Sequence, residues 1–147
     1  MVDLPFPENK KFALKCKKNN INFIQLVSPT TSNARLKQII KNSHDMIYYI
    51  SMLSTTGGIL KVSPKKIINE YSKIKNQNRS KNVVIGFGIT EKTINSLKKA
   101  DGLVVGSAIC KEITNSIKKR QNPVINVTNV VRKLKNKIIW IGLLRLL

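Results

Sequence analysis

Residues 83–90, VVIGFGIT, and residues 103–109, LVVGSAI, are the two stretches that decide the fold. Each is a run of mainly β-branched apolar residues that reaches a glycine and then enters a helical pattern, as is typical of a strand buried on both faces of a parallel sheet. A single glycine after a strand is often only part of a tight turn, but here the pattern occurs in two consecutive units. The two stretches therefore predict neighbouring parallel strands.

The glycines at the ends of these strands also indicate a phosphate site. Gly86, Gly88 and Gly106 let the backbone approach an anion closely, and a helix beginning at Ser107 offers free N–H groups. In (β/α)8 barrels a phosphate group often binds on the loops after the last two strands. Glu91 replaces the third glycine of a G-x-G-x-x-G motif, and no G-x-x-x-x-G-K-[ST] motif occurs. The pattern therefore favours a phosphate group over a nucleotide.

Strand and helix patterns alternate along the rest of the chain, which predicts a parallel sheet built from right-handed βαβ units. Further strands are expected at 21–27 and 46–51, and a loop at 54–58. Ile109, Ile113 and Ile117 are expected to face inward on the helix after the last strand. A complete (β/α)8 barrel needs about 250 residues, whereas this chain has 147. We therefore expect either part of such a barrel or a smaller fold. Helices are expected to begin near Pro7, Ser32, Ser63, Thr90, Ser107 and Asn126.

The formal net charge of +20 raises the question of a nucleic-acid partner. The lysines are spread over the polar sides of the expected helices, and few aromatic residues are left to stack on bases. We therefore expect a solvated basic surface, with a nucleic-acid-binding domain as a distant alternative.

The remaining composition gives no sign of a metal, disulfide or membrane site. Cys16 and Cys110 are far apart in the sequence, and His44 is the only histidine. The N-terminus does not have the pattern of a signal peptide, and the apolar tail at 138–147 is too short to span a bilayer. We expect a cytoplasmic protein with reduced thiols.

Six segments of the sequence resemble the C-terminal part of the tryptophan synthase alpha subunit family. They occur in the family's order and spacing, and the last two are the most specific: 2–5 (VDLP), 23–29 (FIQLVSP), 48–51 (YYIS), 56–57 (TG), 86–89 (GFGI) and 106–109 (GSAI). The resemblance implies an α/β fold, namely the C-terminal half of a (β/α)8 TIM barrel over residues 1–137. The tail at 138–147 matches nothing in the family.

The resemblance also implies a lyase that cleaves indole-3-glycerol phosphate to indole and glyceraldehyde 3-phosphate in tryptophan biosynthesis. It implies no cofactor in this chain, a beta subunit carrying pyridoxal phosphate as partner, and an alpha-beta-beta-alpha tetramer. In this chain Tyr48 and Phe87 would line the indole pocket, although the residue pattern alone equally fits Tyr48 as a core residue. The substrate phosphate would be held by Gly57, Gly86, Phe87, Gly88, Gly106 and Ser107.

The family's general acid and base are carboxylates that precede the part of the family resembled here, so no catalytic residue is assigned. No role is transferred to Asp3 of this chain. The other acidic residues of this chain are expected on helices or in turns. Segment 51–57 also lacks an arginine and a glycine that many members carry. We therefore expect this chain alone to be inactive. The main alternative is another phosphate-sugar-binding TIM-barrel enzyme. A ligand that carries an indole ring would distinguish the two, because only the lyase pocket should prefer it.

Overall fold

The computed structural model describes residues 4–51, 54–55, 58–59, 62–86 and 89–139. Four parallel strands form the main sheet in the order β1-β2-β5-β6, so every strand lies beside its neighbour in the chain of βαβ units. A two-stranded antiparallel sheet pairs β3 with β4. The strands are β1 (Gln25–Val27), β2 (Met46–Ile50), β3 (Ser54–Thr55), β4 (Gly58–Ile59), β5 (Asn82–Gly86) and β6 (Gly102–Val104).

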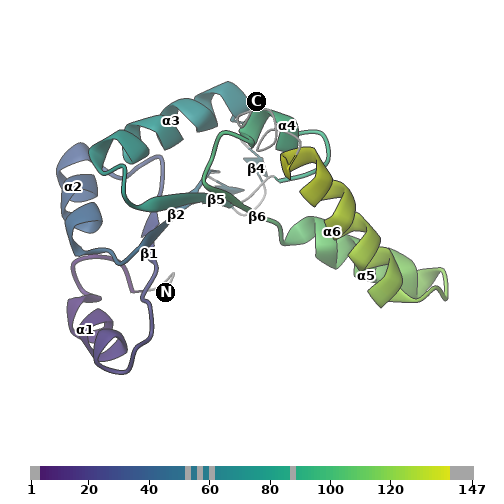
Figure 1. Ribbon diagram of the computed structural model, residues 1–147, viewed down its shortest axis with the longest axis horizontal. Helices are drawn as coiled ribbons and strands as arrows, with labels where there is room; N and C mark the ends of the chain where they lie inside the picture. The colour runs from purple at the N-terminus through teal and green to yellow at the C-terminus, as the bar shows by residue number, and fades with distance from the viewer. Residues whose placement is uncertain (1–3, 52–53, 56–57, 60–61, 87–88, 140–147) are drawn as a thin grey trace.

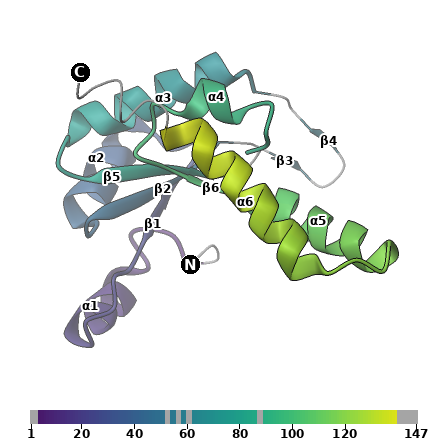
Figure 2. The ribbon, with the colours of Figure 1, turned by 45° about the vertical axis from the view of Figure 1, so that its right-hand side comes forward.

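The described residues form six helices, and Figure 1 shows that α2, α3 and α4 lie along one face of the main sheet. Helices α5 and α6 extend from the sheet as an antiparallel pair, and α1 lies at the opposite end of the molecule, beyond β1 (Figures 1 and 2). The helices are α1 (Lys10–Lys18), α2 (Asn33–Asn42), α3 (Pro64–Gln77), α4 (Ile94–Leu97), α5 (Ser107–Lys118) and α6 (Pro123–Ile139).

Two serines start the helices that cover the sheet. The hydroxyl of Ser32 accepts a hydrogen bond from the Arg35 N–H, and that of Ser63 accepts one from the Lys66 N–H. Each bond satisfies an N–H group that has no partner within the helix, and Pro64 needs none because it has no N–H. Both starts agree with the sequence-based prediction.

The core lies between the sheet and these helices. Residues of β2 alternate, so that Ile47 and Tyr49 are each 1 % exposed while Tyr48 between them is only half-buried. Val83 and Ile85 of β5 face the same side as Ile47 and Tyr49, because the register pairs them across the sheet. The buried side chains of α2 and α3 pack on this face: Leu36, Ile39, Ile40, Ile67, Tyr71 and Ile74.

Among the described residues, no helix lies on the opposite face of the sheet in Figure 1. Its side chains are partly exposed; Val104 of β6, for example, is 40 % exposed. We had predicted strands buried on both faces, and among the described strands only β5 comes close to this, with four consecutive buried residues. The main sheet is therefore an open sheet, with helices of the described residues covering one face and not the other.

The sheet also has two unpaired edges within the described part of the chain, on β1 and on β6. Unpaired N–H and C=O groups on an edge form hydrogen bonds readily with another strand. We expect the 147-residue chain to dimerise or aggregate, and to do so more at high salt because salt screens the repulsion between chains of charge +20. Analytical ultracentrifugation tests this. A monodisperse monomer that unfolds cooperatively would contradict it.

Asp101 stabilises the edge of the sheet where β5 and β6 begin. One of its carboxylate oxygens accepts a hydrogen bond from the Val83 N–H at 2.7 Å and lies 2.9 Å from the Lys75 ammonium of α3. Burial, followed by the neighbouring Asp101 carboxylate, raises the pKa of the Tyr71 hydroxyl. The carboxylate therefore joins α3 to the starts of two strands.

Replacing Asp101 by Ala should destabilise the fold by about 2 kcal/mol, because it leaves the buried Val83 N–H without its partner. Asp101→Asn is the matched control, since its amide oxygen still accepts that bond and only the charge is lost. Urea denaturation followed by circular dichroism compares the two. Equal unfolding midpoints for the parent and Asp101→Ala would show that the carboxylate has no such role.

The structure corrects our predicted start of α6. This helix begins at Pro123 rather than at Asn126, and the Asn122 side-chain oxygen accepts hydrogen bonds from the Val124 and Ile125 N–H groups. The Asn-Pro pair was the better signal, because proline suits the first position of a helix and asparagine the position before it. The Asn126 amide instead donates to the Ser116 hydroxyl at 3.0 Å.

The inward face predicted for α5 is also wrong. Ile113 is 37 % exposed and Ile117 is 63 % exposed, while Ile109 is half-buried. Helix α5 packs mainly against α6 and extends beyond the sheet, so most of its aliphatic stripe has no partner among the described residues. A periodic apolar stripe indicates which face of a helix seeks a partner, but not that the partner is present.

Four further boundaries differ from the prediction, and the first is that helix α1 begins at Lys10 rather than near Pro7. Strand β1 covers only Gln25–Val27, and the expected loop at 54–58 contains the β3 and β4 pair. Helix α4 begins at Ile94, after a turn in which the Thr90 hydroxyl accepts a hydrogen bond from the Thr93 N–H at 3.3 Å. Thr90 thus caps this turn and not the helix itself.

Candidate phosphate site

Gly86 and Gly106 lie at the same edge of the main sheet. Gly86 ends β5 and is in register with Ile50 of β2 on one side and Val104 of β6 on the other. Gly106 follows two residues after Val104 and immediately precedes α5. Because all these strands are parallel, their carboxyl ends meet here, as the two sequence stretches predict.

Ser51 fixes the end of β5 to the end of β2. Its N–H donates to the Gly86 carbonyl oxygen at 3.2 Å, and its hydroxyl donates to the same oxygen at 2.6 Å. Ser51 is fully buried, so water does not compete for these bonds. The sequence analysis assigned no role to Ser51, since a serine after a strand has no distinctive signature.

The ring of Tyr48 covers Gly86 on the open face of the sheet. A Cβ atom added at Gly86 would lie 1.9 Å from the Tyr48 hydroxyl oxygen and 2.2 Å from the ring carbon that bears it. Any side chain at position 86 would therefore force the ring to move. The structure thus brings together two residues that the sequence analysis assigned separately, one to the phosphate and one to the indole pocket.

The neighbouring Tyr49 has a different environment. It lies in the core on the helix side of the sheet, and burial, followed by the Glu70 carboxylate, raises its pKa to about 12. Alternation along the strand therefore separates the two tyrosines. Tyr49 is the core aromatic residue, and Tyr48 faces the open side.

The start of α5 is open to a ligand. Gly106 precedes this helix and, unlike Ser32 and Ser63, provides no side-chain cap. A Cβ atom added at Gly106 would meet nothing within 4 Å, so neither packing nor a positive φ requires glycine there. The Gly106 carbonyl oxygen accepts from the Ile109 and Cys110 N–H groups, whereas the first N–H groups of a helix have no partner within it.

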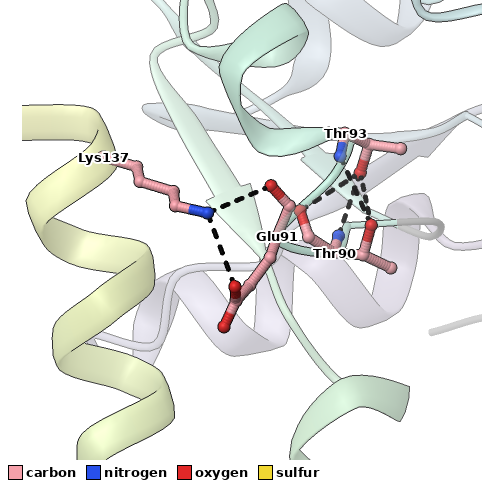
Figure 3. A network of polar contacts seen from close by, with 4 residues as sticks. All are labelled: Thr90, Glu91, Thr93 and Lys137. Carbon is pink, nitrogen blue, oxygen red and sulfur yellow. Dashed lines mark hydrogen bonds and ion pairs between the residues drawn. The ribbon is translucent and has the colours of Figure 1, made fainter.

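The segment that follows β5 contacts helix α6. Figure 3 shows Lys137 of α6 reaching the Glu91 carbonyl oxygen at 3.3 Å and its carboxylate at 3.5 Å. The Thr90 N–H donates to the Thr93 hydroxyl at 2.9 Å, which closes a tight turn beside it. These contacts join the segment after β5 to α6.

Three of the described carboxylates are paired with lysines. The Glu70 carboxylate pairs with Lys73, that of Asp101 with Lys75, and that of Glu91 with Lys137. No group of three or more histidine, cysteine or acidic residues suited to a metal ion occurs in the described ranges. No described helix is long and apolar enough to cross a membrane.

Three of the predicted phosphate and indole residues, Gly57, Phe87 and Gly88, lie outside the described residues. The structure places the other four. Gly86 and Tyr48 are in contact, whereas Gly106 and Ser107 lie on the next strand-helix unit. Helix α6 runs through Ile139, and the rest of the predicted tail at 138–147 is also outside the described residues.

Parallel strands that alternate with helices, with an open inner face and glycines at the carboxyl edge, define this chain as part of a (β/α)8 barrel. The family model for the tryptophan synthase alpha chain matches residues 1–139. The chain therefore belongs to the tryptophan synthase alpha chain family.

Curated relatives support the same assignment. The tryptophan synthase alpha chain of Pelagibacter ubique is 76 % identical over 138 residues, which is 94 % of this chain and 52 % of the relative. That of Cyanidium caldarium is 39 % identical over 92 residues, which is 61 % of this chain and 33 % of the relative. This chain spans about half the length of the first of these relatives.

Solved structures agree with the fold. The tryptophan synthase alpha chain of Legionella pneumophila superposes with a TM-score of 0.83 at 27 % identity, covering 97 % of this chain and 52 % of that one. A structure of the tryptophan synthase a2b2 complex of Pyrococcus furiosus gives a TM-score of 0.66 at 27 % identity, covering 95 % and 54 %. The described strands and helices therefore correspond to part of the barrel.

Proposed function

We propose that this chain supplies the phosphate-binding part of a lyase that cleaves indole-3-glycerol phosphate to indole and glyceraldehyde 3-phosphate. The observation that carries the proposal is the space in front of Gly106, at the uncapped start of α5. A helix start with free N–H groups attracts an anion, and glycine leaves room for it. In this proposal Gly57, Phe87, Gly88 and Ser107 complete the phosphate site.

The indole ring would lie on the open face of the sheet, against Tyr48 and Phe87. The position of Tyr48 supports this, because its ring is half-buried on that face and lies directly over Gly86. An aromatic ring there would bury apolar surface and stack against the tyrosine. The pocket and the phosphate site would then share the end of β5.

The acid and base groups of the reaction would come from outside this chain. Of its seven acidic residues, three are paired with lysines in the described structure. Proton transfer needs acid and base groups within hydrogen-bond reach of the substrate. This chain would therefore bind and orient the substrate without moving its protons.

The same proposal includes a partner. The a2b2 complex of the Pyrococcus furiosus relative supports an association with a beta subunit, in an alpha-beta-beta-alpha tetramer. Pyridoxal phosphate would belong to that subunit, and this chain would hold no cofactor. A cytoplasmic location follows from a soluble biosynthetic role of this kind.

A choice of ligands separates this function from that of another sugar-phosphate barrel enzyme. The experiment uses the completed chain, meaning the part of the Pelagibacter ubique relative that precedes its matched region, joined to Met1. We expect it to bind indole-3-glycerol phosphate at least roughly tenfold more tightly than glycerol phosphate or ribose 5-phosphate, as measured by calorimetry. Tyr48→Ala should reduce this preference and leave glycerol phosphate binding unchanged.

Equal affinity of the completed chain for all three phosphates would contradict the indole pocket. It would favour another sugar-phosphate barrel enzyme, which needs a phosphate site at the carboxyl ends of the strands but no aromatic pocket. Binding of duplex DNA that weakens steeply with salt, with no phosphate-ester binding, would instead indicate a nucleic-acid protein.

A further inference from the structure

A second cavity lies at the other end of the sheet, between α1 and the connection from α2 to β2. It has a volume of about 370 Å³, which is within the size range of small-molecule sites. Gln25 begins β1 and His44 precedes β2, so the cavity is at the amino-terminal ends of these strands. The candidate phosphate site is at the carboxyl ends, and no residue is common to the two.

Positive side chains surround this cavity. On α1, Lys10, Ala13, Leu14 and Lys17 all line it, and their spacing of three, four and seven residues places them on one helix face. The opposite wall is residues 41–44, which include Lys41 and His44. The described lining therefore contains three lysines and a histidine but no carboxylate.

The end of α2 also borders the cavity, and the negative end of its dipole would ordinarily oppose an anion. Two carbonyl groups in its last turns accept side-chain donors. Ser43 donates through its hydroxyl to the Ile40 carbonyl at 2.9 Å, and the Asn42 amide donates to the Gln38 carbonyl at 2.8 Å. The Lys81 ammonium donates to the Ser43 and His44 carbonyls and brings a further positive charge behind this wall.

The floor and apolar side of the cavity are built from fixed groups. The Asn9 amide donates to the Gln25 side-chain oxygen at 2.9 Å, and the two residues are 2 % and 3 % exposed. Phe6 is also buried, and the Lys10 ammonium lies 5.1 Å from the centre of its ring. This cation–π contact holds one positive charge beside an apolar wall.

Helix α1 is fastened to the strand side by more than this amide pair. The rings of Phe12 and Phe23 meet edge to face with their centres 5.8 Å apart, and the Ile21 N–H donates to the Cys16 carbonyl at 2.9 Å. The opposite wall is fixed because α2 is buried through its apolar face. The cavity is therefore present before any ligand arrives.

We propose that this cavity binds a small organic anion. The anion would be a phosphate monoester or a carboxylic acid that also has an apolar body. The anionic group would lie among Lys10, Lys17, Lys41 and His44, and the apolar body against Phe6, Ala13 and Leu14. Binding here is independent of the proposed lyase function, because it uses none of the residues of that site.

The single histidine makes binding directly observable. Phenyl phosphate is titrated into the chain at one fixed pH while the imidazole proton signals of His44 are followed by NMR. We expect a saturable shift with phenyl phosphate, a weaker one with inorganic phosphate, and none with phenol. The titration is repeated in the completed chain, where the signal is assigned by its loss in His44→Gln, so that assembly of the 147-residue chain does not prevent the test.

Matched variants separate the cavity from the general surface charge. K10Q/K17Q should weaken binding of phenyl phosphate roughly tenfold, because two direct charge partners are lost. K11Q/K18Q removes the same charge from the same helix, α1, with the same spacing of seven residues, but neither residue lines the cavity, so binding should change less than about twofold. Ala13→Phe fills the cavity without changing charge and should abolish the shift, with circular dichroism confirming that the fold is kept.

The proposal is overturned if both charge variants weaken binding equally, or if Ala13→Phe binds like the parent. A parent that shows no saturable shift in either form of the chain also overturns it. Repeating the titration in Gly106→Val separates the two sites. Unchanged binding there supports the second cavity, whatever becomes of the proposed lyase function, and lost binding would assign the ligand to the strand-end site instead.

Discussion

The 147-residue chain alone is expected to release no indole from indole-3-glycerol phosphate. Cleavage requires a base and an acid positioned at the substrate, and among the described carboxylates those of Glu70, Glu91 and Asp101 are paired with lysines. Positioned acid and base groups typically contribute about 10²- to 10⁴-fold each, so losing both lowers the rate by roughly 10⁴-fold or more. An indole-release assay on purified protein measures this.

The completed chain is the control for that experiment. It restores the part of the barrel that precedes the matched region of the Pelagibacter ubique relative, and indole release should return with it. A rate for the 147-residue chain near that of an intact alpha chain would contradict the prediction. It would mean that a carboxylate of this chain performs the proton transfer.

Gly106→Val should weaken the affinity of the completed chain for glycerol phosphate at least roughly tenfold, which corresponds to about 1.4 kcal/mol. The valine side chain would occupy the space that is empty in front of Gly106, where the phosphate is proposed to bind. The φ of Gly106 is −117°, so the substitution does not force valine into a positive φ, and thermal melts check that the fold persists. Ser107→Ala should cost only on the order of 1 kcal/mol, because the backbone N–H remains.

Gly102→Ala provides the opposite result at the other end of β6. A Cβ atom there would lie 2.9 Å from a Val84 methyl group, so this variant should lower the melting temperature. Its glycerol phosphate affinity should match that of the parent, since Gly102 is remote from the strand ends. Calorimetric titrations and thermal melts of the three variants provide both readings. Parent-like binding by a folded Gly106→Val variant would remove the physical basis of the phosphate site.

Local signals in the sequence were sufficient for much of the fold. Ser32 and Ser63 mark helix starts because a serine cap acts over three residues, and β5 was evident from its β-branched run ending at Gly86. The start of α6 was predicted wrongly because two competing caps, Asn122 and Asn126, lie within one turn of each other. Only the proline after Asn122 distinguishes them.

Contacts between distant segments could not be predicted in this way. The bond from Ser51 to the Gly86 carbonyl and the contact of Lys137 with Glu91 join residues more than 30 positions apart. The exposure of Ile117 likewise depends on what lies beside α5, not on its own periodicity. For the candidate site, the glycines were evident from sequence, whereas the closeness of Tyr48 to Gly86 required the fold.

The most direct test of the central claim is a crystal structure of the completed chain with glycerol phosphate bound. We expect the phosphate group at the start of α5, within hydrogen-bond distance of the Gly106 and Ser107 N–H groups and beside the end of β5. A phosphate group bound elsewhere, with the space in front of Gly106 filled by protein, would contradict it.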